Sequence, residues 1–341
     1  MDRPAFLEIR DLRVSFPLSN SGTAAFVRAA RGVSFSLSRG EILGVVGESG
    51  SGKSVTTSAI PSLLPPHAIV SGSVLFEGRE LLGLSGGDLR AYRGKRIGMI
   101  FQEPGRSYDP LQTVGGAFFE TLRNADPKIS RRDADRRAAG LLEDVGLDDA
   151  DRRLANYPHQ FSGGQLQRIG IALALAQGCD LLIADEPTTA LDVTIQAQIV
   201  ALLKGIRDKR GIAVIFISHN IDLVAGVADR LLVMYGGLAM ESGPARAVLE
   251  SPAHPYTRAL LAAAPRFGAH CSDGRLLSIP GRVPDPTRHE PGCPFAPRCP
   301  RAVAACAAAI PEMTLLAAEA AAADAGSSRE YRCILEPEAE T

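Results

Sequence analysis

Runs of apolar residues of strand length recur along the chain and end in small or polar residues. Four of them lie at 42–46, 97–101, 181–184 and 212–217. Uninterrupted apolar runs of this length are typical of strands that are buried on both faces of a parallel sheet. Two other segments, 55–64 and 161–176, place their apolar residues at helical spacing. Strands and helices in this combination predict an α/β fold.

The overall composition narrows the class of protein. The 341 residues suit one large domain with an appendage, or two domains. Because 37 basic and 38 acidic residues nearly cancel, nucleic acid is a weak candidate partner. The apolar runs fall far short of the about 20 residues that cross a bilayer. The first residues carry charges and no apolar core of a secretion signal, which favours a cytoplasmic location with reduced cysteines.

The segment at 47–54 matches the phosphate-binding pattern G-x-x-x-x-G-K-[ST] and lies between a predicted strand and a predicted helix. It consists of Gly47, Glu48, Ser49, Gly50, Ser51, Gly52, Lys53 and Ser54, and Val55 follows it. Glycines let backbone N–H groups and a helix N-terminus surround nucleotide phosphates. Lys53 would add a positive charge, and the Ser54 hydroxyl would hold Mg²⁺. The alternative, a flexible Gly/Ser loop, does not explain the flanking strand and helix.

Two acidic residues, Asp185 and Glu186, directly follow the apolar run 181–184. Open α/β sheets bind their ligands at the carboxyl ends of their strands. Asp185 suits the Mg²⁺ shell, and Glu186 suits a base that polarises an attacking water. A solvated acidic turn is the alternative, and it fits poorly after so apolar a strand.

Two more polar residues follow apolar runs in the same way. His219 comes after the run 212–217, where an imidazole could contact the γ-phosphate and orient the water. A purely structural histidine is the alternative. Gln102 follows the run 97–101 and offers an amide to Mg²⁺ or to water.

A second helix start also carries small residues, at Ser162, Gly163 and Gly164, with Gln165 after them. A helix N-terminus beside small residues can bind an anion. The chain therefore has two predicted phosphate-binding surfaces. We expect the second one to serve a nucleotide that is held by another ATPase copy.

In this order along the chain, the motifs resemble those of ATP-binding cassette (ABC) transporter ATPases. The matching parts are Walker A at 47–54, the Q-loop Gln102, the signature at 161–165, Walker B at 181–186, the D-loop Ala190-Leu191-Asp192 and the switch His219. The resemblance implies a head-to-tail ATP sandwich, in which the P-loop of one subunit and the signature of its partner enclose each ATP. It also implies Mg²⁺ ligands at Ser54, Gln102 and Asp185, and Phe16 stacked on adenine, with Phe26 as a substitute.

The same resemblance implies an ABC-type P-loop NTPase fold. Its parts would be a RecA-like core, an antiparallel β subdomain at about 5–45 and a helical signature subdomain at about 103–178. Departures from the family pattern are small. Phe161 stands where the family usually has leucine, and Asn220 stands where it usually has aspartate. Neither change removes a group that contacts phosphate. A hydrolysis-competent site is therefore expected. The segment 105–110 varies near the expected permease contact and could tune partner choice.

Within ABC proteins the chain resembles the D-type ATPase subunits of the peptide and nickel importer group, through stretches such as HPYTRALLAAAP at 254–265. The resemblance implies an ATPase that powers import of dipeptides or oligopeptides, peripheral to the cytoplasmic face of the inner membrane. The implied partners are a second, F-type ATPase, two transmembrane permeases and an extracytoplasmic solute-binding protein. Nickel and glutathione-like solutes stay open as alternatives. A soluble ABC ATPase of DNA repair or ribosomes fits less well, because the charge is balanced and there is one cassette.

After Pro265 the composition shifts to proline and then to alanine, which predicts an ATPase domain at 1–265 and a C-terminal extension at 266–341. Five of the six cysteines lie in this extension, and four of them form a cluster, at Cys293, Cys299, Cys306 and Cys333. Clustered cysteines in a reduced compartment predict a metal, either a [4Fe–4S] cluster, as the resemblance implies, or zinc. The alternative is small buried residues, which is how Cys179 and Cys271 are interpreted.

Overall fold

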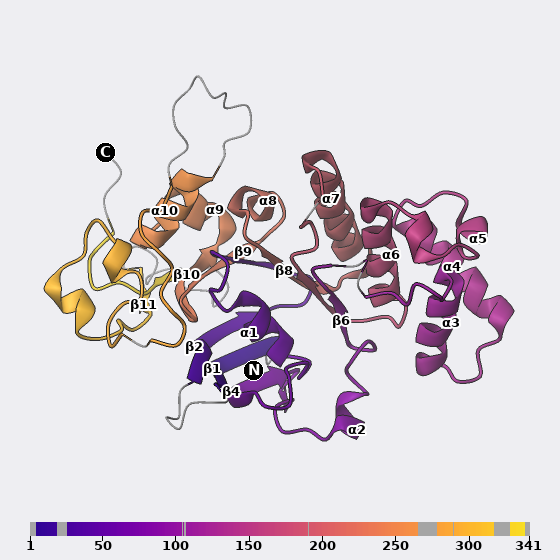
Figure 1. Ribbon diagram of the computed structural model, residues 1–341, viewed down its shortest axis with the longest axis horizontal. Helices are drawn as coiled ribbons and strands as arrows, with labels where there is room; N and C mark the ends of the chain where they lie inside the picture. The colour runs from indigo at the N-terminus through magenta and orange to yellow at the C-terminus, as the bar shows by residue number, and fades with distance from the viewer. Residues whose placement is uncertain are drawn as a thin grey trace. The chain divides into compact units, whose positions relative to one another are not determined.

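The computed structural model describes residues 5–18, 26–103, 105, 107–189, 191–264, 278–288, 290–316 and 328–337. These residues belong to two compact units, each assembled from separate stretches of the chain. Unit 1 takes 1–38, 42–83 and 218–341, and unit 2 takes 39–41 and 84–217. Both units contain helices and strands, so the predicted α/β class is confirmed (Figure 1).

Unit 1 begins with an antiparallel sheet in the order β2-β1-β4-β5. Its strands are β1 (Leu7–Pro17), β2 (Phe26–Leu37), β4 (Ile69–Phe76) and β5 (Arg79–Glu80). In β1 the apolar Leu12 and Val14 are buried while Arg13 between them is exposed, as expected for a sheet with one covered face. The antiparallel β subdomain predicted at about 5–45 includes β1 and β2, whereas β4 and β5 lie outside that range.

The second sheet of unit 1 has the order β11-β12-β10-β9-β3. Its strands are β3 (Ile42–Val46), β9 (Arg230–Tyr235), β10 (Leu238–Pro244), β11 (Thr314–Leu315) and β12 (Glu330–Tyr331). β3 and β9 are parallel, and the other neighbours are antiparallel. Every residue of β3 is buried, as its uninterrupted apolar sequence predicts.

The helices of unit 1 are short. They are α1 (Lys53–Ala59), α8 (Ile221–Ala225), α9 (Ala245–Glu250) and α10 (Pro255–Ala263). α1 ends at Ala59 rather than at the predicted residue 64. Pro61 has no backbone N–H to continue the helix, and Ser62 adopts a φ of 54°, which turns the chain away.

The described part of the extension lies in unit 1 and has little regular structure. It contains the 3₁₀ turns Ala296–Arg298 and Ala304–Ala307 besides β11 and β12. Because β12 pairs with β10, the extension continues the second sheet. Arg329 also forms an ion pair of 3.1 Å with Glu241 of β10, whose side chain is 0% exposed. The extension is therefore attached to the sheet through both backbone and side chains.

Unit 2 contains parallel strands in the order β8-β7-β6. They are β6 (Ile97–Ile100), β7 (Leu181–Asp185) and β8 (Ala213–Ser218). All residues of β7 and β8 are buried. The three apolar runs at 97–101, 181–184 and 212–217 are thus strands, as predicted.

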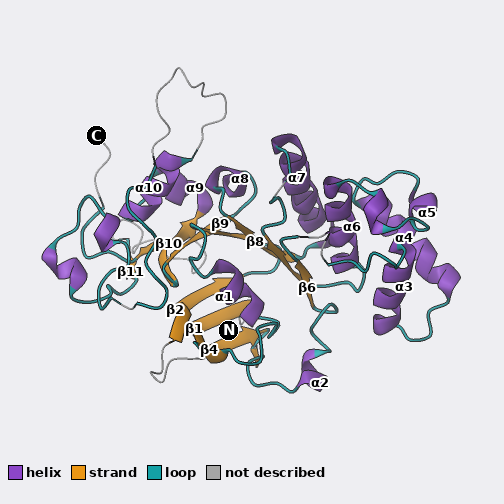
Figure 2. Ribbon diagram, viewed as in Figure 1, coloured by secondary structure: helices purple, strands orange, loops and turns teal. Residues whose placement is uncertain are grey.

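Unit 2 also contains helices. They are α2 (Gly86–Leu89), α3 (Val114–Ala125), α4 (Arg131–Asp144), α5 (Ala150–Arg153), α6 (Gly163–Leu175) and α7 (Val193–Arg210). α3, α4, α5 and α6 pack together and lie in the region 103–178 that was predicted to be helical (Figure 2). Among the residues that the structure describes, no helix is both long enough and apolar enough to span a bilayer.

Candidate functional site

The loop at 47–54 joins β3 to α1, and its path requires glycine at two positions. Gly47 has a φ of 154° and Gly52 a φ of 95°, values that residues with a side chain rarely adopt. A Cβ atom on Gly47 would lie 2.1 Å from the carbonyl oxygen of Met234, and one on Gly52 would lie 2.1 Å from that of Ala29. The backbone of the loop therefore packs directly against β9 and β2.

The side chain of Lys53 folds back into this loop. Its ammonium donates to the carbonyl oxygens of Gly47 at 2.8 Å and Glu48 at 3.0 Å, and it lies 3.4 Å from the Ser51 hydroxyl. Only 4% of the residue is exposed. Oxygen atoms of the loop thus fix a positive charge inside the phosphate-binding motif.

Two residues beside the loop were not indicated by the sequence patterns. The hydroxyl of Tyr256, in α10, accepts the backbone N–H of Glu48 at 2.8 Å. The guanidinium of Arg298, in the extension, binds both carboxylate oxygens of Glu48, at 2.6 and 3.1 Å. Tyr256 belongs to the stretch HPYTRALLAAAP, so that stretch was the available signal. Nothing in the sequence around Arg298 indicates its partner.

In unit 2 the structure brings two predicted site residues together. The amide of Gln102, just after β6, donates to Glu186 Oε2 at 3.0 Å, and Thr189 Oγ1 donates to the same oxygen at 2.9 Å. Glu186 directly follows β7 and has a φ of 45°, which is uncommon for a residue with a side chain. Its N–H donates to the carbonyl of Ile217 in β8 at 3.1 Å, which holds the turn. Asp185, at the end of β7, is 7% exposed.

The predicted residues thus form two sets, one in each unit. The loop 47–54 and His219 belong to unit 1, whereas Gln102, Asp185 and Glu186 belong to unit 2. His219 follows β8 and is exposed.

The residue after His219, Asn220, caps α8 by accepting the N–H groups of Asp222 and Leu223 at 3.0 and 3.3 Å. An aspartate would accept the same bonds, so this departure from the family pattern preserves the helix start.

The signature residues form the predicted helix start. The Oγ of Ser162 accepts the N–H of Gln165 at 3.3 Å, and Gln165 Oε1 accepts the N–H of Ser162 at 3.1 Å. This reciprocal arrangement is a capping box at the beginning of α6. Ser162 and Gly163 are exposed, and Gly164 is confined, because a Cβ there would lie 2.9 Å from Cγ2 of Ile195. The phenylalanine at 161 is buried and does not disturb the cap.

The remaining predicted residues lie around these sets. Phe16, in β1, is half-buried, and its ring lies 6.0 Å from that of His67. Phe26 begins β2, and Val55 lies in α1. Asp192 of the D-loop caps α7 by accepting the N–H of Ile195 at 2.9 Å, while Ala190 lies outside the described residues.

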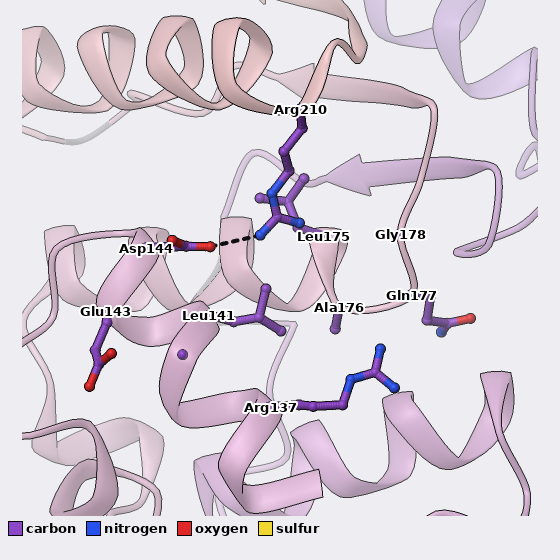
Figure 3. Close-up of a pocket in the computed structure, with 10 residues that line it drawn as sticks. Arg137, Leu141, Glu143, Asp144, Leu175, Ala176, Gln177, Gly178 and Arg210 are labelled. Carbon is purple, nitrogen blue, oxygen red and sulfur yellow. Dashed lines mark hydrogen bonds and ion pairs between the residues drawn. The ribbon is translucent and has the colours of Figure 1, made fainter. Parts of the chain in front are cut away.

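A separate cavity in unit 2, of about 540 Å³, lies where α4 meets the ends of α6 and α7 (Figure 3). One of its two acidic residues, Asp144, pairs with Lys209 at 2.6 Å and with Arg210 at 2.9 Å. These hydrogen bonds lower the pKa of the Asp144 carboxyl, so the carboxyl stays ionised. The two ion pairs join α4 to α7. None of the predicted site residues lines this cavity, so it is not the candidate site.

The four clustered cysteines of the extension, Cys293, Cys299, Cys306 and Cys333, lie close enough to interact electrostatically. The N–H of Cys293 donates to the carbonyl of Cys306 at 2.8 Å. Burial raises the pKa of the Cys293 and Cys299 thiols, and interaction with Cys306 and Cys333 raises it further.

The predicted metal site is not supported by the structure. Over the described ranges, no group of three or more His, Cys, Asp or Glu side chains is arranged to hold a metal ion. Sequence clustering brought the four cysteines into one region, but it did not indicate ligand geometry. The prediction of a cysteine-ligated [4Fe–4S] cluster or zinc site therefore finds no support in the structure, in which these four cysteines form no disulfide bond. Cys179 is 4% exposed, as predicted for a packing residue, and Cys271 lies outside the described residues.

Comparison with known proteins identifies the fold family. The sequence profile of the ABC transporter family matches residues 30–189, and that of the oligopeptide/dipeptide transporter C-terminal region matches residues 240–306. The dimeric structure of MJ0796, a bacterial ABC transporter cassette, is similar with a TM-score of 0.62 at 26% identity, over 70% of this chain and 99% of that chain. A post-hydrolysis state of the MJ0796 ATP-binding cassette, bound to ADP and phosphate, gives a TM-score of 0.61. The predicted ABC cassette fold is confirmed.

Curated relatives narrow the family further. The dipeptide transport ATP-binding protein DppD of Bacillus subtilis is 46% identical over 311 residues, which are 91% of each chain. The oligopeptide transport ATP-binding protein OppD of Escherichia coli is 45% identical over 90% of this chain and 89% of that protein. OppD of Mycobacterium tuberculosis is 44% identical over 93% of this chain, which spans about half (51%) of that relative's length. The chain belongs to the oligopeptide and dipeptide transport ATP-binding proteins of the ABC transporter family, as its motifs predicted.

Proposed function

We propose that this chain binds MgATP and hydrolyses it to power the import of peptides. Two arrangements carry the proposal: a buried lysine is fixed inside a glycine loop of unit 1, and a glutamate is fixed by a glutamine after the strands of unit 2. Phosphate binding requires the first arrangement, and activation of water requires the second. The similarity to a cassette that is bound to ADP and phosphate supports this chemistry.

The nucleotide is bound by unit 1. Residues 47–54 and Val55 surround the phosphates, and Lys53 exchanges a loop carbonyl for a phosphate oxygen. Phe16 supplies an aromatic surface for adenine, with Phe26 as the substitute. The buried position of Lys53 supports this assignment, because a buried ammonium keeps its charge only beside oxygen partners.

Ser54, Gln102 and Asp185 would hold Mg²⁺. They offer a hydroxyl, an amide and a carboxylate, and these are the oxygen ligands that Mg²⁺ prefers. The NH₂ group of Gln102 donates to Glu186, which leaves the amide carbonyl oxygen to face a cation. When bound, Mg²⁺ neutralises phosphate charge and orients the phosphates.

Glu186 polarises the attacking water, and His219 orients that water against the γ-phosphate. The hydrogen bonds from Gln102 and Thr189 to Glu186 Oε2 support this role, since they fix the direction of the carboxylate. Gln102 thereby takes part in both water activation and metal binding.

A second ATPase completes each site. We assign Ser162, Gly163, Gly164 and Gln165 to contact the ATP of the partner subunit, with Asp192 at the dimer contact. The Ser162 hydroxyl acts as an acceptor in the capping box, so its proton remains available for a phosphate oxygen. The similarity to a dimeric cassette supports a dimer, and the D-type resemblance favours a distinct F-type partner.

The chain works at the cytoplasmic face of the inner membrane, bound to two transmembrane permeases that receive solute from an extracytoplasmic binding protein. The cassette at 1–265 carries the chemistry, and the extension at 266–341 supports it. The names of the relatives support dipeptides or oligopeptides as cargo, with nickel and glutathione-like solutes as the alternative.

Glu186→Gln in the transporter reconstituted with its permeases tests the proposal. The ATPase rate should fall at least about a hundredfold while MgATP still binds, because the general base is lost and the phosphate loop is intact. Glu120→Gln, at an exposed carboxylate of α3 in the same unit, is the matched control and should keep the wild-type rate. An unchanged ATPase rate after Glu186→Gln would refute the proposal.

A further inference from the structure

Arg298 is a buried arginine in a segment with little regular structure. Its side chain is 4% exposed. Nη1 donates to Glu48 Oε2 at 2.6 Å and to the Tyr235 hydroxyl at 3.0 Å, and Nη2 donates to Glu48 Oε1 at 3.1 Å. Nη2 also donates to the carbonyl of Ile279 at 3.0 Å, and Nε donates to that of Pro280 at 2.8 Å. All five N–H donors are used, so the orientation of the guanidinium is fixed.

Its partner, Glu48, lies inside the phosphate-binding loop and is held at three points. The carboxylate binds Arg298, and the backbone N–H donates to the Tyr256 hydroxyl at 2.8 Å. The carbonyl oxygen accepts from Lys53 Nζ at 3.0 Å and from the N–H of Ser51 at 3.2 Å. Glu48 therefore connects the extension and α10 to the lysine of the loop.

These contacts fix the plane of one peptide group. The peptide between Gly47 and Glu48 directs its carbonyl to Lys53 Nζ at 2.8 Å and its N–H to Tyr256. Because the C=O and N–H of a trans peptide point in opposite directions, rotation of this plane would break both bonds. The first peptide of the loop is thus held in one orientation from outside the loop.

An aromatic cluster positions the groups that bind Glu48. The ring centroids of Tyr235, Tyr256 and Phe295 lie 4.5 to 5.4 Å apart. Phe295 comes from the extension and is 1% exposed. The Arg298 guanidinium lies over the Tyr235 ring at 5.7 Å, which adds a cation–π contact. The extension thus supplies both the arginine and part of the apolar wall behind it.

We propose that Arg298 is a positioning residue for nucleotide binding, which acts on the phosphate-binding loop through its bidentate pair with Glu48. The inference rests on the proposed ATPase function. A loop that is already in its binding conformation loses less conformational entropy when phosphates bind, so affinity is higher. Without Arg298, the Glu48 carboxylate loses its partner and the first peptide of the loop is held less firmly.

Isothermal titration of the full chain with MgATP tests this role. Arg298→Ala should raise the Kd for MgATP about tenfold, and Arg298→Lys should restore part of the affinity, because an ammonium pairs with only one carboxylate oxygen at a time. Glu48→Gln should have a similar effect. The double variant Glu48→Gln/Arg298→Ala should be no weaker than either single variant, because both changes remove the same interaction. Arg282→Ala, which changes an exposed arginine of the extension, is the control and should leave the Kd for MgATP unchanged.

Steady-state kinetics separate positioning from general damage. A positioning role raises the KM for ATP while kcat at saturating ATP stays within about twofold, whereas partial unfolding lowers the active fraction and hence kcat. If Arg298→Ala does not fold, the Kd of Glu48→Gln for MgATP is the test of the proposal. This variant keeps Arg298, and glutamine has nearly the same volume as glutamate. If wild type binds no MgATP, the proposed function fails. If wild type binds MgATP and the folded variants bind it with the same Kd, the function stands and the role of Arg298 is overturned.

Discussion

Replacement of His254 should remove an acid-dependent loss of stability in unit 1. His254 is 1% exposed, and its Nδ1 accepts the N–H of Tyr256 at 2.9 Å, which caps α10. Burial lowers the pKa of His254 to about 4, and the positive charge of Arg332 acts in the same direction, while a hydrogen bond to the backbone of Arg332 opposes them. The folded chain therefore holds this imidazole neutral.

The sign and size of the effect follow from this shift. In the unfolded chain the imidazole has a pKa of 6.5. Between pH 6.5 and about 4 the unfolded state binds a proton that the folded state does not bind, so the free energy of unfolding falls as the pH falls. The slope within the window approaches about 1.4 kcal/mol per pH unit, and the whole shift amounts to about 3 kcal/mol. Above this window the imidazole is neutral in both states, so it contributes nothing to the pH dependence of the unfolding free energy.

Urea unfolding of wild type and His254→Asn, followed by far-UV circular dichroism from about pH 7.5 to about pH 5, measures the effect. Asparagine caps helices well and does not titrate, so it is a suitable replacement. The stability of wild type relative to the variant should decrease by about 2 kcal/mol as the pH falls from about 6.5 to about 5. Carboxylates that titrate in the same range are common to both proteins and cancel. A difference in stability that stays constant over this range would refute the reasoning.

Three further predictions concern other parts of the chain. Gly52→Ala should abolish MgATP binding in a titration experiment, because its Cβ would lie 2.1 Å from a backbone carbonyl of β2. Gly50→Ala has no atom within 4 Å of its Cβ, so it should weaken MgATP binding less. Equal affinities of the two variants for MgATP would contradict this reasoning. Arg329→Met should lower the free energy of unfolding in urea by about 3 to 5 kcal/mol, because it leaves the buried carboxylate of Glu241 without its arginine. A loss below about 1 kcal/mol would show that backbone donors suffice. Ser162→Ala should destabilise α6 by about 1 kcal/mol, seen in hydrogen exchange of its first turn, and slow ATP hydrolysis by the assembled transporter.

Local sequence signals predicted the parts of the fold that depend on local physics. The runs at 181–184 and 212–217 lack polar residues. A strand that is buried on both faces is apolar at successive positions, so these runs indicated buried strands. The loop at 47–54 was predicted because its positive φ angles can be met only by glycine at fixed positions. The helix start at Ser162 was predicted for a similar reason, since a cap is set by residues within one turn.

Features that depend on distant partners could not be predicted. Glu48 matched a variable position of the motif, and its partner Arg298 lies 250 residues away in an irregular segment. The strands β4 and β5 have mixed polar sequences, so their pairing with β1 was not indicated by periodicity. For the cysteines, spacing along the chain carried no information on whether the sulfur atoms could surround an ion.

The pairing of β12 with β10 bears on how this protein is shortened for study. Truncation near residue 264 would retain every ATPase motif, yet it would uncover the edge of β10, and an uncovered strand edge invites association between molecules. The shortened protein would also keep Glu241 and Glu48 while it loses the arginines that neutralise them. A minimal cassette designed from the motifs alone would therefore be prone to aggregate, and its nucleotide affinity would not represent that of the intact subunit.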